Sequence, residues 1–447
     1  MIPSGNSYIS TGYHPLNGGF ENQTRTMARK TFDIPEMYHS PVIRLVKEAN
    51  KVTDPRKKDL SPTLLDFGPV RFLIPRHFGF CYGVENAIDI AYKTIREHPD
   101  KDIYLLSEMI HNPTVNEDLQ NRGVKFLFQT DGTERIPIES LDSSDIVIVP
   151  AFGTTLEIQK RLQKQGIDPY EFNTTCPFVE KVWNRGNQLG EKGYSLVIHG
   201  KHQHEETRAT FSHSAAHSHA VVVLNPDEAK ILAGIMTGER APEEFQSWFG
   251  HKSTEGFDPL VHLEHFGVIN QTTMLASETR EVMNILKEAA AQRYESGEAD
   301  GHFADTSDTL CYATNENQSA TYALAEAEPD LAVVVGGYNS SNTMHLVEIL
   351  EKECPTYHVR DAGEIEGPRR IQHFNQWKKE IETTGNWLPA DQKPVTVALT
   401  SGASCPDILV DEVLLNIHSW FPEALPVESV LKPFQEKQQT TPDLPER

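Results

Sequence analysis

The chain has 447 residues, a length that suggests about three domains and is ample for a large hydrophobic core. Its net charge of -23 disfavours a nucleic-acid-binding or anionic-membrane surface, so an anionic ligand has to be held by a local patch of donors. Five scattered cysteines are too few for a disulfide framework and favour a reducing compartment, and no apolar run is long enough for a transmembrane helix.

Residues 1–68 are predicted to form a polar N-terminal extension that is partly disordered, with an amphipathic stretch near Pro41–Ala49. The first 26 residues contain one Arg and one Glu and lack the apolar segment of a secretory signal. We interpret them as a disordered arm or as a start upstream of the true one at Met27. A transit peptide is the alternative, although the segment is poor in arginine. The ordered chain is expected to begin at Val70.

The stretch Gly79-Phe80-Cys81-Tyr82-Gly83 lies where a predicted apolar strand, Val70–Ile74, gives way to a helix with an apolar face. Glycines let the backbone approach a bulky group closely. A helix N-terminus favours the thiolate form of a cysteine, which is the form that ligates metals. A buried thiol in a strand–helix turn is the simpler interpretation of one isolated cysteine, so the rest of the chain has to decide.

Three segments repeat one architecture, in which a cysteine precedes a helix and three strands follow in turn. The segments begin at Cys81, Cys176 and Cys311. Their first strands are predicted at 102–106, 195–200 and 331–337, and their third strands at 145–154, 266–273 and 395–404. The second strands begin at residues 124, 220 and 356, which lie 43, 44 and 45 positions past the three cysteines. Strands that alternate with helices predict parallel α/β sheets, whose ligands bind beyond the carboxyl ends of the strands.

The predicted fold class is therefore α/β, with three domains that pack around a pseudo-threefold axis. The boundaries are placed at 69–175, 176–310 and 311–431, followed by a disordered tail at 432–447. This packing brings one helix-capping thiol from each domain to the centre. Three thiolates suit a [4Fe–4S] cluster with one iron left open, which by analogy with zinc sites marks a catalytic metal. Chance agreement of the spacings is the alternative, and zinc is less attractive because no CxxC pair is present.

The same packing directs the polar loops at the strand ends toward that centre. Hydroxyls, amides, imidazoles and helix N-termini suit an anion such as diphosphate. The candidates are His111, His204, Thr272, Ser340, Ser341, Asn342 and Ser404. Glu206 is the candidate proton donor and Glu205 is its rival. Cys354 and Cys405 are interpreted as packed core thiols.

At these residues the chain resembles the 4-hydroxy-3-methylbut-2-enyl diphosphate reductase family, IspH/LytB. The resemblance covers residues 79–407, most of the ordered chain. It is carried by the motifs GlyPheCysTyrGlyVal (79–84), IleHisAsnProThrVal (110–115), ThrCysProPheValGluLysVal (175–182), HisGluGluThr (204–207), AsnGlnThrThr (270–273), CysTyrAlaThr (311–314), AsnSerSerAsn (339–342) and SerGlyAlaSerCysProAsp (401–407).

The resemblance implies a trefoil of three α/β domains around one [4Fe–4S] cluster and the last step of the methylerythritol phosphate (non-mevalonate) isoprenoid pathway. In that step a two-electron reduction removes the substrate hydroxyl, bound at the open iron, and gives isopentenyl and dimethylallyl diphosphate. Ferredoxin or flavodoxin is the implied electron donor. No nucleic-acid or membrane partner is expected. The expected location is cytoplasmic, or plastid if the N-terminal extension is a transit peptide.

Carried over motif by motif, Cys81, Cys176 and Cys311 would be the cluster ligands, and Glu206 would be the proton donor. Thr272 would orient the substrate hydroxyl and assist proton relay. The diphosphate would be held by His111, His204, Ser340, Ser341, Asn342 and Ser404.

One departure concerns the family's AlaHisGly motif, which here reads Ala151-Phe152-Gly153 and resembles the plant and cyanobacterial branch. It removes one imidazole from the phosphate set, so either donors such as Thr154 compensate or phosphate binding is weaker. Two other functions remain open at this stage, a quinolinate-synthase-like enzyme and a non-catalytic iron–sulfur redox sensor. The pairing of HisGluGluThr with AsnSerSerAsn favours the reductase over the first, and the donor-rich anion pocket argues against the second.

Overall fold

The computed structural model describes residues 32–56, 58–294, 299–304, 306, 309–389 and 394–439. The predicted N-terminal arm, the alternative start at Met27 and the last eight residues of the predicted tail, 440–447, lie outside the described residues. No helix within the described ranges is long and apolar enough to span a bilayer. The expected compartment stays a prediction.

Three sheets share one order of parallel strands. In each, the first strand of the repeat lies in the middle, and the second and third strands pair with it on opposite sides. All of these strands fall within the predicted ranges, which confirms the α/β fold and its internal repeat. They are β3 (Ile103–Leu105), β4 (Lys125–Phe126) and β5 (Ile146–Ile148), then β6 (Ser195–His199), β7 (Ala220–Val223) and β8 (Phe266–Asn270), then β10 (Leu331–Val335), β11 (Thr356–Val359) and β15 (Val395–Ser401).

The segment that precedes each cysteine does not pair with the sheet of the unit that this cysteine begins. It pairs with the third strand of another unit. β2 (Val70–Ile74), before Cys81, pairs in parallel with β15. Asn173, before Cys176, bridges to Val149 at the end of β5. β9 (Phe303–Ala304), before Cys311, pairs with β8. The chain thus leaves one sheet and passes through a cysteine into the first helix of the next unit.

This crossing corrects the predicted place of β2. The boundary at 69–175 assigns it to the first domain, whereas it lies in the sheet of the third. Val70, Phe72 and Ile74 alternate along the strand and are buried in the same core as β10 and β15. Alternation predicts that one strand face is buried, but it does not say which sheet buries that face.

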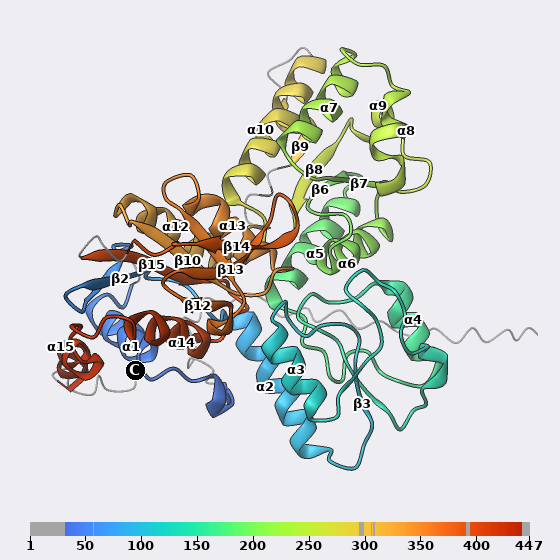
Figure 1. Cartoon of the computed structure of the whole chain (residues 1–447). Coiled ribbons are helices and arrows are strands. Elements are labelled where there is room, and N and C mark those ends of the chain that lie inside the picture. The colour runs from blue at the N-terminus through green and yellow to red at the C-terminus, as the bar shows by residue number, and fades with distance from the viewer. Residues whose placement is uncertain are drawn as a thin grey trace, which may run out of the picture. The chain divides into compact units, whose positions relative to one another are not determined.

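The ordered chain also extends further at both ends than predicted. β1 (Thr63–Asp66) pairs antiparallel with β2, and α1 (Ile43–Thr53) lies beside α14 (Asp407–His418) and α15 (Val427–Gln439) (Figure 1). The expected start at Val70 and the expected disorder from residue 432 are therefore wrong within the described residues. Apolar side chains recur at helical spacing in α1 and α15 and pack into one core. Short amphipathic sequences are weak predictors of helices, because most of the stability of such a helix comes from this tertiary packing.

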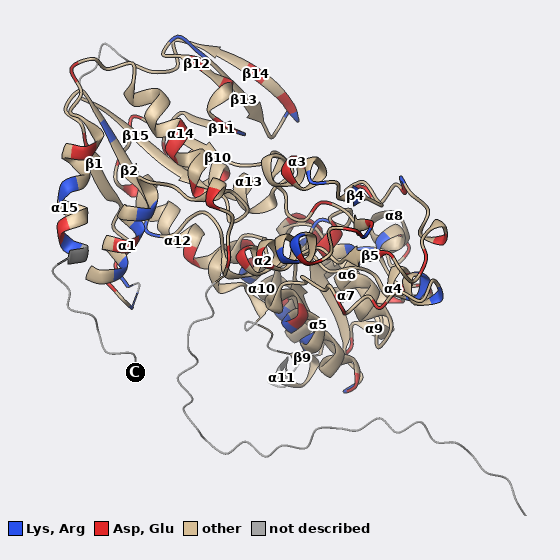
Figure 2. Cartoon of the chain, turned by 90° about the horizontal axis from the view of Figure 1, so that it is seen from below, with Lys and Arg blue, Asp and Glu red and all other residues tan. Residues whose placement is uncertain are grey.

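The remaining helices connect and cover the strands; α7 and α10, for example, lie side by side (Figure 1). Basic residues predominate along α1, whereas α15 carries both acidic and basic residues, as Figure 2 shows. A small antiparallel sheet, which the sequence does not predict, consists of β12 (Ile365–Gly367), β13 (Arg370–Asn375) and β14 (Glu380–Gly385). The helices are α2 (Tyr82–Glu97), α3 (Pro113–Asn121), α4 (Leu156–Lys164), α5 (Pro177–Gly190), α6 (Glu205–Ala215), α7 (Pro226–Thr237), α8 (Glu244–Phe249), α9 (Pro259–His262), α10 (Ala276–Arg293), α11 (Ala299–His302), α12 (Tyr312–Glu326) and α13 (Ser341–Leu350).

The start of α1 depends on a carboxylate from α14. Asp411 is fully buried, and its two oxygens accept the backbone N–H groups of Val42 and Ile43 at 2.9 and 3.0 Å. We expect Asp411→Ala to lower the free energy of unfolding by about 1–3 kcal/mol, because the buried Val42 N–H loses its acceptor and the Ile43 N–H keeps only the Ser40 hydroxyl. Urea denaturation measures this, with the exposed Glu412→Ala on the same helix as the control. Equal stability of the two variants would contradict the prediction.

Candidate functional site

The three repeat cysteines occupy equivalent places in the fold. Cys81, Cys176 and Cys311 are the N-cap residues of α2, α5 and α12, each with extended backbone angles. Pro177, in the first turn of α5, has the fixed φ angle that suits a helix start. The helix starts expected directly after the cysteines are therefore confirmed.

Electrostatics and packing show that the three thiols lie near one another. Burial, and then the charge of Cys311, raise the pKa of Cys81 to about 11. Burial likewise raises the pKa of Cys176, with Cys81 and Cys311 as additional causes. A Cβ atom on Gly83 would come within 2.5 Å of the Cys176 sulfur. Gly83 therefore provides clearance for the thiol of the next unit, which is a more specific role than the sequence suggested.

The spacing of the sulfurs bears on which group they could hold. Among the described residues, the only three potential ligand groups whose atoms all lie within 4.8 Å of one another are His111, His204 and Glu205. The cysteine sulfurs are therefore not all that close together. Zinc bound to thiolates at about 2.3 Å would bring tetrahedrally placed sulfurs to about 4 Å from one another. Buried thiols that converge without touching fit a larger group, such as an iron–sulfur cluster, better than a single ion.

His111 follows β3 and precedes the N-cap of α3, and its side chain is buried. Its Nδ1 lies 3.2 Å from an oxygen of Glu108, and its Nε2 lies 3.3 Å from an oxygen of Glu205. Burial lowers the pKa of this imidazole, but the hydrogen bonds to the two carboxylates outweigh burial and raise the pKa to about 9. His111 is therefore an imidazolium at neutral pH, with a proton on each nitrogen.

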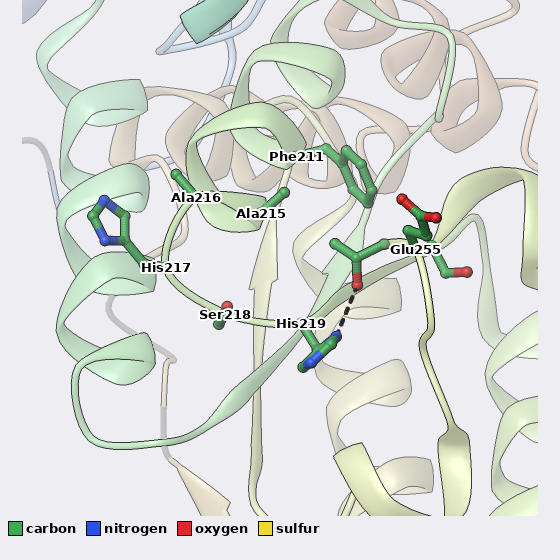
Figure 3. A pocket seen from close by; sticks show the side chains of 9 residues that line it. Phe211, Ala215, Ala216, His217, Ser218, His219 and Glu255 are labelled. Carbon is green, nitrogen blue, oxygen red and sulfur yellow. Dashed lines mark hydrogen bonds between the residues drawn. The ribbon is translucent and has the colours of Figure 1, made fainter.

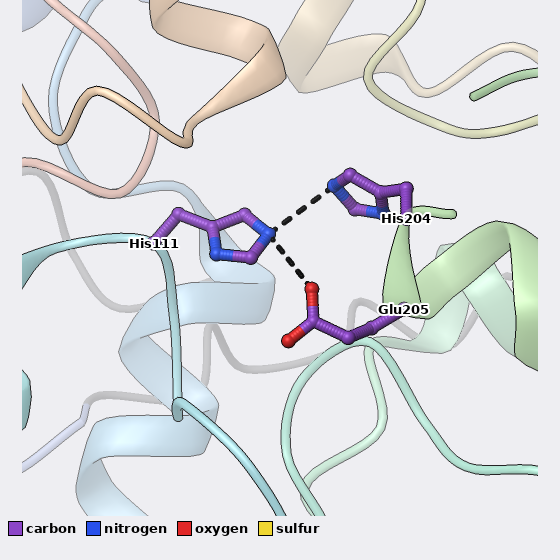
Figure 4. A group of neighbouring side chains, drawn as sticks. All are labelled: His111, His204 and Glu205. Carbon is purple, nitrogen blue, oxygen red and sulfur yellow. Dashed lines mark hydrogen bonds and ion pairs between the residues drawn. The ribbon is translucent and has the colours of Figure 1, made fainter. Parts of the chain in front are cut away.

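His204 is the N-cap of α6, and its Nδ1 accepts the backbone N–H of Glu206 at 3.1 Å. Burial, and then the charge of His111, lower the pKa of His204 well below its ordinary value, so the neutral ring carries its proton on Nε2. That nitrogen faces Nε2 of His111 at 3.2 Å, as Figure 4 shows. Two N–H donors cannot satisfy each other. The Glu205 carboxylate accepts the N–H of His111, so the N–H of His204 is the one suited to an anionic oxygen of a ligand.

Glu206 is almost fully buried at the start of α6. Its two oxygens accept the backbone N–H and the hydroxyl of Thr272, the latter at 3.0 Å. Burial raises the pKa of Glu206 to about 7, although the bonds from Thr272 and the charge of His111 act in the opposite direction. Its charge also contributes, after burial and the hydrogen bonds of Thr314 and Ala313, to the pKa of Cys311. A carboxyl group that exchanges a proton near neutrality therefore lies within electrostatic reach of the Cys311 thiol.

The third unit contributes hydroxyls and amides at the start of α13. Ser340 is its N-cap, and the Ser404 hydroxyl lies 3.4 Å from the Ser340 oxygen and donates to the His111 carbonyl at 3.1 Å. Asn342 accepts the Ala403 N–H at 2.7 Å, while its buried amide nitrogen has no hydrogen-bond partner among the described residues. A buried donor without an acceptor points to a missing ligand or water.

Four polar residues of the site were not predicted or were ranked lower. Gln271, between Asn270 and Thr272, accepts the Lys201 N–H and the Thr207 hydroxyl and contacts Ser341 at 3.4 Å, so it joins the second and third units. Glu108 and Asn339 both contact Nδ1 of His111, and Glu205 contacts its Nε2. The sequence signal for Gln271 is its place in the AsnGlnThrThr motif. Glu108 lies three residues before His111, whereas Glu205 and Asn339 come from the second and third units. No single spacing in the sequence therefore predicts the three partners of His111.

Phe152 lies against both imidazoles. Its ring stacks on His111 with a centroid distance of 4.3 Å and meets His204 edge-on at 5.5 Å. It thus packs the rings without donating a hydrogen bond. Thr154, two residues later, is buried beside a cavity of about 320 Å³ that Glu205 and Arg208 also line.

A second cavity, of about 600 Å³, lies at the start of β7, which is an edge strand of the second sheet. It is lined by His217, His219 and Thr254, among others, directly before β7 begins (Figure 3). Ligands of parallel sheets bind beyond the carboxyl ends of the strands, where the cysteines and the imidazole pair are found. The candidate site therefore remains at those ends.

Comparison with known proteins gives consistent matches over most of the chain. A model of the LytB protein family matches residues 73–418. A 4-hydroxy-3-methylbut-2-enyl diphosphate reductase of Gloeobacter violaceus is 38% identical over 353 residues, covering 78% of this chain and 83% of that protein. One from Cyanothece sp. is 36% identical over 411 residues, covering 92% and 95%. The solved E-1-hydroxy-2-methyl-but-2-enyl-4-diphosphate reductase of Plasmodium falciparum has a similar fold, with a TM-score of 0.56 at 19% identity over 81% of this chain and 96% of that one.

Proposed function

This chain belongs to the LytB protein family, and we propose that it is a 4-hydroxy-3-methylbut-2-enyl diphosphate reductase of the methylerythritol phosphate pathway. The reaction replaces the substrate C–OH bond by C–H. Two electrons and two protons enter, one water leaves, and isopentenyl and dimethylallyl diphosphate are the products. The observation that carries the proposal is the convergence of three buried helix-capping thiols beside a pocket of anion donors.

The diphosphate binds to the imidazole pair and to the start of α13. His111 contributes a positive charge, and His204 beside it contributes an N–H. The unpartnered amide of Asn342 and the hydroxyls of Ser340, Ser341 and Ser404 supply further donors. These donors hold phosphate oxygens against the field of a chain whose net charge is -23.

Cys81, Cys176 and Cys311 would hold one [4Fe–4S] cluster. Their burial, their mutual electrostatic influence and the clearance at Gly83 all suit such a group. When bound, the cluster supplies electrons to the substrate one at a time and an iron that lacks a protein ligand. Ferredoxin or flavodoxin is the proposed source of those electrons.

Glu206 delivers a proton to the departing hydroxyl. Its pKa of about 7 means that it is partly protonated at neutral pH, and Thr272 fixes its orientation through two hydrogen bonds. Glu205 is the less suitable donor because its oxygens contact Ser107 and the imidazolium of His111. It instead keeps His111 protonated.

The two alternative functions, a redox sensor and a quinolinate-synthase-like enzyme, are not supported by a specific feature of the site. A redox sensor needs the three thiols but has no use for a buried imidazole pair or for a protonatable Glu206. A quinolinate-synthase-like enzyme shares the three-thiol design, but its prediction rested on that design alone.

The decisive experiment is anaerobic purification, followed by incubation with a chemical reductant and 4-hydroxy-3-methylbut-2-enyl diphosphate. Isopentenyl and dimethylallyl diphosphate are the expected products. A brown, cluster-loaded protein that forms neither of them would refute the proposal.

Phe152 is expected to support substrate binding through the two imidazoles that it packs. Each aromatic contact contributes about 0.5–1.5 kcal/mol, so Phe152→Ala should raise KM about tenfold with a smaller change in kcat. Steady-state kinetics measures this. Phe152→Tyr is the control, because it keeps both ring contacts. A KM that stays unchanged in Phe152→Ala would show that the ring does not position the imidazoles.

A further inference from the structure

Four aromatic residues form a surface patch beside the thiols, which we call the axial aromatic patch: Phe32, Tyr82, Phe178 and Tyr312. Tyr82 and Tyr312 directly follow Cys81 and Cys311, and Phe178 is two residues after Cys176. The rings meet in two edge-to-face pairs, with centroid distances of 5.0 Å for Phe32–Tyr82 and 4.8 Å for Phe178–Tyr312. Each repeat unit thus places one ring in the first turn of its thiol-capped helix.

The two tyrosines of the patch are exposed although their rings are large. Tyr82 is 40% and Tyr312 44% exposed, whereas Phe32 and Phe178 are half-buried, as are the residues Cys81 and Cys176. The aromatic residues that adjoin the three cysteines in the chain thus meet across units, and two of them reach the surface.

The substrate machinery lies on other elements than the patch. Glu206, Thr272 and His111 are buried and His204 is half-buried, and all four are hydrogen-bonded to one another or to the loops beside them. An electron carrier that docked there would compete with the diphosphate for the same donors. The axial aromatic patch leaves that pocket free.

We propose that the axial aromatic patch is the docking surface for a small electron-carrier protein with a one-electron centre. This inference rests on the proposed function, which requires electrons from outside the chain. In each encounter the carrier centre is oxidised by one electron, and the group held by the three cysteines is reduced by one. Two encounters supply the two electrons that, with two protons, convert the substrate C–OH bond into C–H and release water.

The size and chemistry of the patch fit such a partner. Complexes of electron carriers bury little surface, below about 1,200 Å², because they must separate after each transfer. Aromatic side chains are enriched in protein interfaces, and tyrosine combines a large contact area with few rotatable bonds. Two half-exposed tyrosines over the thiols suit a contact that is brief and close to the redox group.

A plant-type [2Fe–2S] ferredoxin serves as the probe, with Tyr312→Glu and Tyr82→Glu as the variants. Tyr322→Glu is the matched control, since Tyr322 lies on the same helix as Tyr312 and is 42% exposed. Anaerobic calorimetry measures the affinity of oxidised ferredoxin for the cluster-loaded enzyme. Stopped-flow absorbance measures reduction of the cluster by reduced ferredoxin, and turnover with reduced methyl viologen measures the chemistry without a protein partner.

In both patch variants we expect the affinity for ferredoxin and the rate of cluster reduction by ferredoxin to fall at least about tenfold. Both quantities should be the same in Tyr322→Glu as in the unchanged enzyme. Turnover with methyl viologen should stay within about twofold for every variant that carries its cluster. Unchanged ferredoxin affinity in both patch variants, or no saturable binding to the unchanged enzyme, would overturn the docking proposal. Absence of turnover with methyl viologen in the unchanged enzyme would instead refute the proposed function, and the binding measurement would still stand.

Discussion

Glu206→Gln is expected to lower kcat by about 10²–10⁴-fold while the cluster and the substrate affinity are retained. Glutamine has nearly the same shape, and its side-chain oxygen can still accept the Thr272 N–H, so the local structure should persist. What it lacks is a proton that can be released near neutral pH. Single-turnover kinetics and substrate titration separate the chemical step from binding.

Glu205→Gln is the matched control, since it changes the neighbouring carboxylate of the same helix. Its main effect should be on KM, because it removes one of the two carboxylates that keep His111 protonated. Full turnover in Glu206→Gln together with a collapse of kcat in Glu205→Gln would reverse the two assignments.

The pH dependence of kcat follows from the raised pKa of Glu206. A donor with a pKa of about 7 is protonated below that pH and loses its proton as pH rises. We expect kcat to be level below about pH 6 and to fall toward tenfold per pH unit above about pH 8. His111, with a pKa of about 9, keeps its charge over most of that range, so KM should rise only at higher pH. A flat kcat profile from pH 6 to 9 would exclude Glu206 as the proton source.

Cys311→Ser is expected to abolish cluster assembly and, with it, activity. Cys311 is buried as the N-cap of α12, and a hydroxyl is a much poorer ligand for iron than a thiolate. Iron and sulfide analysis, together with the visible absorption of the anaerobically purified protein, measures the loss.

Cys354→Ser is the control for the loss of a buried thiol away from the site. Cys354 is packed in a separate apolar cluster with Leu324 and Leu350, as predicted for a core thiol, so this variant should keep its full iron content. Cys405 is likewise buried in the core of the third unit. A stable Cys311→Ser protein with a complete cluster would contradict the model in which three cysteines hold the group.

The sequence alone determined the repeat and the identity of most candidate residues. The nearly equal spacing from each cysteine to its second strand reflects one unit repeated three times, because the rise per residue of helices and strands is set by local geometry. Cys81, Cys176 and Cys311 are all helix N-caps, as their surroundings predict. The polar loops beyond the parallel strands were located by the same reasoning.

Only the tertiary structure decided which strands pair in each sheet and which ionisable groups lie next to one another. β2 pairs with β15, more than 300 residues away, since alternating apolar residues specify a buried face without naming the partner strand. The protonation of His111 depends on Glu108 and Glu205, and the proton of His204 on the backbone of Glu206. Burial gives Glu206 its pKa of about 7, and burial is a property of the packed chain. Residue types are written in the sequence, whereas pKa values arise from neighbours that folding brings together.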